Sequence, residues 1–212
     1  MNKILFIDTL TTGPFPSKCG IYAIGGSVCE DTQTETRELK RFEFRMRPFE
    51  DARIIDKSLW LGGMTRSQLI YFKKEAEVLE DFVKMLSEVV KVSDPADKIF
   101  LCGFNTSAFD MPFLKEWFDR NENRNFRNVF HMQSIDLLSI SAYALMDERK
   151  AMKEFNLDSV ARKLGILTKV QERYSCLDNV AACIGIYRKL KERLGMGEWG
   201  SFTESGELIV NY

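Results

Sequence analysis

The sequence has few cysteines, and none of them forms a C-x-x-C pair. Its five cysteines are odd in number and scattered along 212 residues. This distribution argues against a disulfide framework or a zinc ribbon and is typical of a reducing compartment. No apolar run approaches the length of a membrane span, and no cleavable signal pattern precedes the first predicted strand. We therefore expect a cytoplasmic protein with no membrane partner.

The sequence also lacks an excess of either charge. Its 30 lysines and arginines nearly balance its 31 aspartates and glutamates, so no overall field indicates a nucleic-acid or membrane partner. A local basic surface remains compatible with this balance, because net charge averages over faces. The length suits one sizeable domain and is short for two. We predict one domain over residues 1–195 and a C-terminal tail, residues 196–212, that packs on it.

Hydrophobic periodicity predicts an α/β fold. Three strands, at residues 3–8, 21–31 and 38–48, follow one another through short polar turns and predict an antiparallel meander. Within the second strand, two adjacent glycines at 25 and 26 indicate a bulge or a close backbone approach. Later segments alternate between helix and strand, which predicts a mixed sheet whose further strands are parallel and which is flanked by helices. The predicted later elements are helices over 75–90, 109–120, 156–166 and 177–195, a strand over 97–105, and a strand-to-helix segment over 128–145 in which Asp136 caps the helix.

Three aspartates stand at positions that suit a catalytic or metal-binding site. Asp8 ends the first strand, Asp110 lies just past the strand that ends at Asn105, and Asp178 opens the last long helix. In α/β sheets, ligands bind at the carboxyl ends of strands. Each aspartate alone is typical of a turn or a helix cap. Together they predict a site for Mg²⁺ or Mn²⁺, which prefer hard oxygen ligands and support phosphodiester cleavage as a pair about 4 Å apart.

At these residues the sequence resembles the DnaQ-like (DEDD-type) 3′–5′ exonucleases. "FIDTLTTG" at 6–13 resembles their first motif, F-x-D-x-E-T-T-G, and "GFNTSAFDMPFL" at 103–114 is similar to their second, G-h-N-x-x-F-D-x-x-F-L, with three residues in place of two between Asn105 and Phe109. "YSCLDNVAACIGIY" at 174–187 is similar to their third motif. Residues 44–69 and 156–166 match the family's hGIT segment and the short helix before the third motif. The matches occur in the family's order over most of the chain.

The resemblance implies an RNase H-like fold and stepwise removal of nucleotides from the 3′ end of single-stranded DNA or RNA. A DNA polymerase is the protein partner that it suggests. Asp8 would bridge two metal ions, Asp110 would serve mainly the second, and Asp178 would hold the first. The turn after Asp8 would present backbone N–H groups to the terminal nucleotide. The substrate-binding residues that the resemblance implies are Thr9, Leu10, Thr11, Thr12, Phe104 and Asn105.

Two residues depart from the family pattern. Leu10 replaces the glutamate that helps to hold the first metal, so we expect one tight and one weak ion. Arg173 stands where many members carry a histidine as general base. Tyr174, four residues before Asp178, matches the spacing of a subgroup in which a tyrosine orients the attacking water. Two functions stay open: a weakened exonuclease, and a catalytically inactive relative that binds nucleic-acid ends or a partner.

Overall fold

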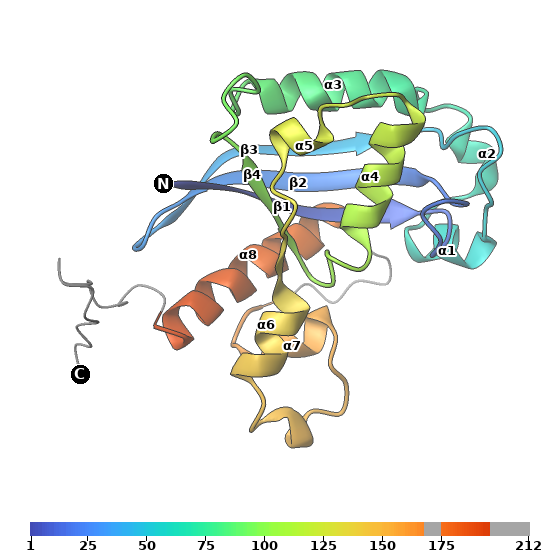
Figure 1. The fold of residues 1–212 in the computed structure, drawn as a ribbon. Coiled ribbons are helices and arrows are strands. Elements are labelled where there is room, and N and C mark those ends of the chain that lie inside the picture. Colours follow the sequence, from blue (N-terminus) through green and yellow to red (C-terminus); the bar gives the residue numbers. More distant parts are fainter. Residues whose placement is uncertain (168–174, 196–212) are drawn as a thin grey trace.

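Five strands form one mixed sheet in the order β3-β2-β1-β4-β5 (Figure 1). The structure is a computed structural model, and it describes residues 1–167 and 175–195. β1 pairs antiparallel with β2, and β2 pairs antiparallel with β3, whereas β4 is parallel to both β1 and β5. This confirms the predicted fold class. The strands are β1 (Asn2–Thr11), β2 (Ile21–Asp31), β3 (Thr36–Arg45), β4 (Ile99–Gly103) and β5 (Ile135–Asp136).

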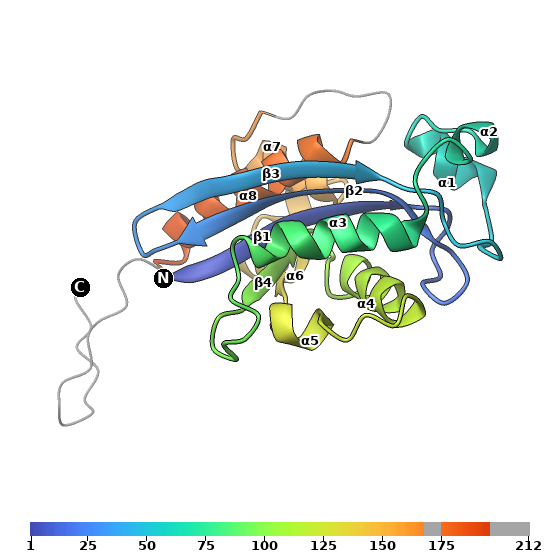
Figure 2. The same ribbon diagram turned by 90° about the horizontal axis from the view of Figure 1, so that it is seen from above.

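Helices cover both faces of the sheet and one of its ends. α3, α4 and α5 lie on one face, and α6, α7 and α8 lie on the other (Figures 1 and 2). α1 and α2 stand beyond the end of β1 that carries Thr11 (Figure 1). A single 3₁₀ turn, Arg149–Ala151, lies between α6 and α7. The helices are α1 (Asp56–Leu61), α2 (Arg66–Leu69), α3 (Glu75–Ser87), α4 (Asp110–Arg120), α5 (Phe126–Val129), α6 (Leu137–Ala144), α7 (Leu157–Lys163) and α8 (Cys176–Arg193).

The apolar run at the start of β1 is continuous because both faces of the strand are covered. Successive side chains of a strand point to opposite faces. Leu5 and Ile7 pack with the α3, α4 and α5 side, and Ile4 and Phe6 pack with the α6, α7 and α8 side. The same alternation places the Asp8 side chain on the α8 face and directs Thr9 toward α4.

Gly25 of β2 lets helix α8 approach the sheet next to Asp8. Gly25 is the register partner of Asp8, and a Cβ atom at Gly25 would lie 2.5 Å from the Cβ of Cys176. On the opposite face, a Cβ atom at Gly26 would lie 2.5 Å from the Phe42 ring. The two glycines therefore mark a close approach, as one of the two sequence interpretations predicted. The bulge interpretation is wrong at this point, because the register of β2 shifts elsewhere.

Two parts of the sequence prediction lie outside the described residues. One is the tail, residues 196–212, and the other is Tyr174. The division of the chain at residue 195 therefore stays a prediction. Among the residues that the structure describes, no helix has the length and apolar character needed to span a bilayer.

Candidate active site

Asp110 lies at the sheet edge where β1 and β4 end. It is the first residue of α4, which follows β4, and β4 is the parallel neighbour of β1. Its carboxylate is buried, with 4% of the residue exposed. Thr9 holds one carboxylate oxygen through its backbone N–H at 3.0 Å and its hydroxyl at 2.7 Å, and the Thr106 hydroxyl donates to the other oxygen at 3.2 Å. Neighbours on either side of the site therefore fix the orientation of Asp110.

Asp8 faces the first turn of α8. The Asn179 side-chain amide donates to Asp8 Oδ2 at 3.3 Å, and the Cys176 thiol also hydrogen-bonds to Asp8. Asp178, which is partly buried, lies between these two residues, and its backbone N–H donates to the Ser175 hydroxyl at 3.4 Å. Cys176 and Asn179 were not predicted as site residues from the sequence. Their three-residue spacing puts them on one face of a helix, and this signal in the third motif could have identified them.

The two carboxylates repel each other in an environment that disfavours charge. Burial raises the pKa of Asp8 well above its ordinary value, and the neighbouring Asp110 charge raises that pKa further. Burial also raises the pKa of Asp110 to about 6, against the opposing hydrogen bonds from Thr9 and Thr106. Burial and the Asp8 charge raise the pKa of Cys176 as well, so its thiol stays protonated and can donate to Asp8.

Leu10 lies close to this acidic pair. It is the second residue after Asp8 in β1 and therefore points to the same face of the sheet. Its partly buried side chain packs with an apolar cluster that includes Tyr22, Met64 and Cys176, and Cys176 in turn contacts Asp8. The residue that departs from the family pattern is thus an apolar neighbour of the candidate site.

The threonines after Asp8 bond within the protein. The Thr11 hydroxyl donates to the Gly13 carbonyl at 2.8 Å, and the Thr12 hydroxyl donates to the Arg53 carbonyl at 2.7 Å. The Thr12 backbone N–H, predicted to face a nucleotide, already donates to the Gly20 carbonyl at 2.9 Å. These bonds make the turn rigid. Contacts from Thr9, Leu10, Thr11 and Thr12 to a substrate stay predictions.

Asp136 organises the loop that carries the second motif. It caps α6, as predicted, by accepting from the Leu138 N–H at 3.0 Å. It also accepts from the Asn105 N–H at 3.1 Å, and from both the N–H, at 3.0 Å, and the hydroxyl of Ser107. Asn105 has a left-handed backbone with φ of 70°, and Phe104 beside it is partly buried against the α8-side core. The roles of Phe104 and Asn105 in nucleotide binding stay predictions.

A family model for the RNase H superfamily matches residues 58–195. The chain belongs to the RNase H superfamily. No curated protein sequence matches it. Its RNase H fold is similar to that of exonuclease I from E. coli. In complex with a dT13 oligonucleotide, that enzyme aligns with a TM-score of 0.72 at 19% identity, over 92% of this chain and 42% of exonuclease I.

Two further structures of the E. coli enzyme give the same result. Its zinc-bound complex with single-stranded DNA has a TM-score of 0.71 at 18% identity, over 93% of this chain and 42% of that chain. Its complex with a dA16 oligonucleotide has a TM-score of 0.69 at 19% identity, with the same coverage. This RNase H-superfamily chain thus spans less than half the length of exonuclease I. The resemblance to DnaQ-like exonucleases is confirmed at the level of the fold.

The chemistry of the acidic pair suits a hard divalent cation. Superfamily members of this fold typically use divalent metals. Asp8 and Asp110 supply carboxylate oxygens, and their hydrogen-bond partners Thr9, Thr106 and Asn179 are neutral. A cation beside two carboxylates favours their ionised forms and would offset the repulsion that raises their pKa values. Within 1–167 and 175–195, however, no group of three or more His, Cys, Asp or Glu side chains is arranged to hold a metal ion. The three-aspartate site therefore stays a prediction.

We expect Asp136→Ala to lower the free energy of unfolding of this RNase H-superfamily chain by about 2–4 kcal/mol. The substitution leaves the backbone N–H groups of Asn105 and Ser107 without their acceptor and removes the cap of α6. Urea unfolding at neutral pH measures the change. Asp136→Asn keeps one acceptor oxygen and should lose less. Equal unfolding midpoints for wild type and Asp136→Ala would contradict this role.

Proposed function

We propose that this chain removes nucleotides from the 3′ end of single-stranded nucleic acid by metal-dependent phosphodiester hydrolysis. The observation that carries the proposal is the pair of interacting carboxylates: Asp8, which is partly buried in β1, and Asp110, which is buried at the start of α4 after the parallel strand β4. The fold neighbours that were crystallised with single-stranded DNA favour DNA as the polymer. A DNA polymerase is the predicted protein partner.

In this reaction the protein would orient the carboxylates that hold the metal ions, and the bound ions would keep these carboxylates ionised. Asp8 and Asp110 would hold Mg²⁺ or Mn²⁺, and Asp178 would complete the set from α8. Bound divalent cations supply activation of water and stabilisation of the leaving oxygen in phosphodiester cleavage. Thr9 and Thr106 fix the Asp110 carboxylate, while Asn179 and the Cys176 thiol fix Asp8. Tyr174 would orient the attacking water, as the resemblance implies.

Leu10 supports a second candidate function, the binding of 3′ ends without cleavage. An aliphatic side chain beside Asp8 offers no oxygen to a cation. If the three aspartates hold the ions too weakly for cleavage, the protein would bind single strands without shortening them. The two functions differ only in turnover, so one assay separates them.

The assay uses the full chain with two single-stranded DNA 20-mers, one labelled at the 5′ end and one at the 3′ end. We expect Mn²⁺ and Mg²⁺ to give a ladder of shortened 5′-labelled products and immediate release of a 3′-labelled mononucleotide, and we expect EDTA to prevent both. A gel-shift measurement runs in parallel. Binding without shortening would support the end-binding function. Neither binding nor cleavage would overturn both functions.

A further inference from the structure

A second polar site lies behind the turn that follows Asp8. It is a pocket of about 670 Å³. Its lining includes four cationic side chains, two acidic ones, and the apolar side chains of Phe49 and Ile70. We call it the basic pocket; its cationic residues are Arg47, Arg66, Lys74 and Arg120. Positive charge is therefore concentrated in this pocket, although the whole chain has a net charge of −1.

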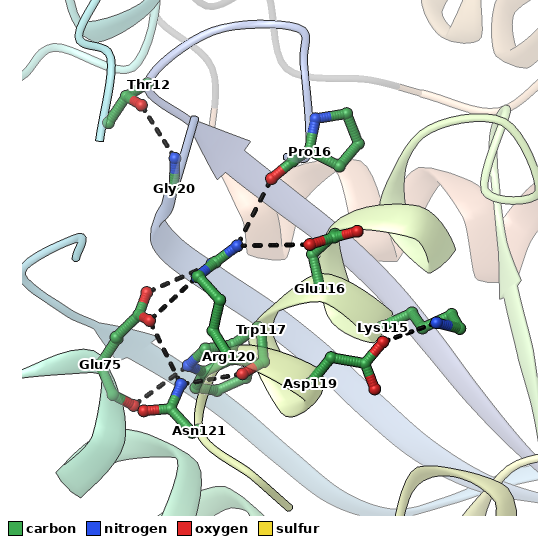
Figure 3. A network of polar contacts seen from close by, with 10 residues as sticks. All are labelled: Thr12, Pro16, Gly20, Glu75, Lys115, Glu116, Trp117, Asp119, Arg120 and Asn121. Atoms are coloured by element: carbon green, nitrogen blue, oxygen red, sulfur yellow. Dashed lines mark hydrogen bonds and ion pairs between the residues drawn. The ribbon is translucent and has the colours of Figure 1, made fainter. Parts of the chain in front are cut away.

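Two of the four cations are used within the protein. Arg120 donates to both oxygens of the buried Glu75 carboxylate, at 3.3 and 3.4 Å, and its guanidinium lies 4.2 Å from the centre of the Phe49 ring. Figure 3 shows the hydrogen bonds between Arg120 and Glu75, and the Asn121 amide also donates to Glu75. Arg66 pairs with Asp56 at 2.6 Å. The acidic charge of Glu75 is therefore already balanced.

The other two cations, Arg47 and Lys74, form no ion pair in the described part of the chain. They are register partners in a parallel bridge, and the Arg47 N–H donates to the Lys73 carbonyl at 2.8 Å. Like charges on paired backbone positions repel each other. The remaining acid of the lining, Glu50, is exposed. A bound anion would relieve the repulsion between Arg47 and Lys74.

The basic pocket shares a wall with the turn after Asp8. Ile54 lines the pocket, and the residues on either side of it bond to Thr12. The Arg53 carbonyl accepts from the Thr12 hydroxyl at 2.7 Å, and the Ile55 N–H donates to the Thr12 carbonyl at 2.8 Å. On the other side, Arg120 donates to the Pro16 carbonyl at 3.4 Å, in the loop that leaves this turn (Figure 3). The pocket is thus tied on two sides to the turn that follows the Asp8 strand.

We propose that the basic pocket binds a backbone phosphate of the same single strand, upstream of the nucleotide that is removed. This inference rests on the proposed function and names how the strand is held. Arginine and lysine contacts to phosphates position a nucleic acid irrespective of sequence. The volume admits a nucleotide, and Phe49 with Ile70 provides an apolar wall against a sugar or base, as in single-strand grooves. The shared wall with Thr12 favours a phosphate of the substrate strand over an acidic peptide.

The test compares Arg47→Ala/Lys74→Ala with wild type by fluorescence anisotropy of a labelled dT20 strand in EDTA, between 50 and 200 mM salt. We expect the dissociation constant at 100 mM salt to rise about tenfold and the salt slope to fall by about 1–2. The matched control is Lys150→Ala/Lys153→Ala, which removes the same charge from two exposed positions, Lys150 within the 3₁₀ turn Arg149–Ala151 and Lys153 just after it. It should bind as wild type does.

Cleavage of a short and a long strand separates this inference from the proposed function. The pocket variant should cleave a dinucleotide at the wild-type rate and dT20 more slowly, because only the long strand extends to the pocket. If wild type cleaves neither strand, the proposed function fails, and the salt slope still tests the pocket. Unchanged slope and affinity in the variant would overturn the inference. The inference would also be overturned if dTMP or a polyglutamate peptide competed for wild type as well as unlabelled dT20 does, and if the variant lost this competition. The pocket would then bind a free nucleotide or an acidic partner.

Discussion

Asp8→Asn should abolish metal-dependent cleavage and at the same time stabilise the metal-free protein. Asp8 is the carboxylate that α8 and α4 both approach, through Asn179 and through Asp110. In the proposed function Asp8 is a metal ligand, so removing its charge would weaken the activation of water, which is worth several kcal/mol in the transition state. We expect cleavage in Mn²⁺ to fall on the order of a thousandfold. The 5′-labelled 20-mer measures this loss.

The gain in stability comes from relief of repulsion between the buried charge of Asp110 and the partly buried charge of Asp8. Both carboxylates have raised pKa values, so their ionisation at neutral pH opposes folding when no cation is present. In EDTA at pH 7.5 we expect Asp8→Asn to raise the free energy of unfolding by roughly 1–3 kcal/mol. Addition of Mn²⁺ should stabilise wild type and leave the variant unchanged. The control Asp147→Asn, at an exposed position, should change neither quantity. A variant less stable than wild type in EDTA would contradict the account.

The sheet could be predicted from the sequence because its long strands carry strong local signals. β1, β2 and β3 have ten or eleven residues each. Only β2 and β3 are joined by a short polar turn, residues 32–35, whereas the connection from β1 to β2, residues 12–20, is a longer loop and not a short turn. α1 and α2 escaped prediction because helices of six and four residues are too short to show a 3.6-residue period. β5 has only two residues, Ile135 and Asp136, and exists through its pairing with β4. Such elements depend on tertiary contacts rather than on local propensity.

The candidate site was also only partly predictable from the sequence. Asp8 and Asp110 follow from the motifs, because Asp8 lies in β1 and Asp110 follows its parallel neighbour β4. The expected end of the first strand at Asp8 is wrong, since β1 continues to Thr11 through its pairing with β2. The contacts of Cys176 and Asn179 with Asp8 depend on how closely α8 approaches β2, and Gly25 sets that distance. A glycine pair in a strand indicates a close approach but not its partner, which lies about 150 residues away along the chain. The paired charges of Arg47 and Lys74 were likewise invisible, since a bridge between separate segments brings them together.

Leu10→Glu should strengthen cation binding and increase cleavage. The side chain at position 10 lies on the same face of β1 as Asp8, and glutamate is the residue that the DnaQ-like pattern carries there. Another carboxylate beside the acidic pair adds oxygen ligands and negative charge for the cation that we expect wild type to hold weakly. We expect Mn²⁺ affinity at the weak site to rise about tenfold, as measured by titration calorimetry, and cleavage of the 20-mer to rise by about tenfold to a hundredfold.

Leu10→Gln is the control that separates charge from shape. Glutamine has the size of glutamate, and both lose the apolar packing of Leu10 against Tyr22 and Met64. In EDTA, however, only Leu10→Glu adds a buried like charge, so it should unfold more easily than Leu10→Gln by roughly 1–3 kcal/mol. Mn²⁺ should reverse that order, because the cation binds the folded glutamate variant most tightly. Equal cation affinities for the two variants would show that position 10 does not face the metal. The expected weak binding of one ion would then not follow from the missing glutamate.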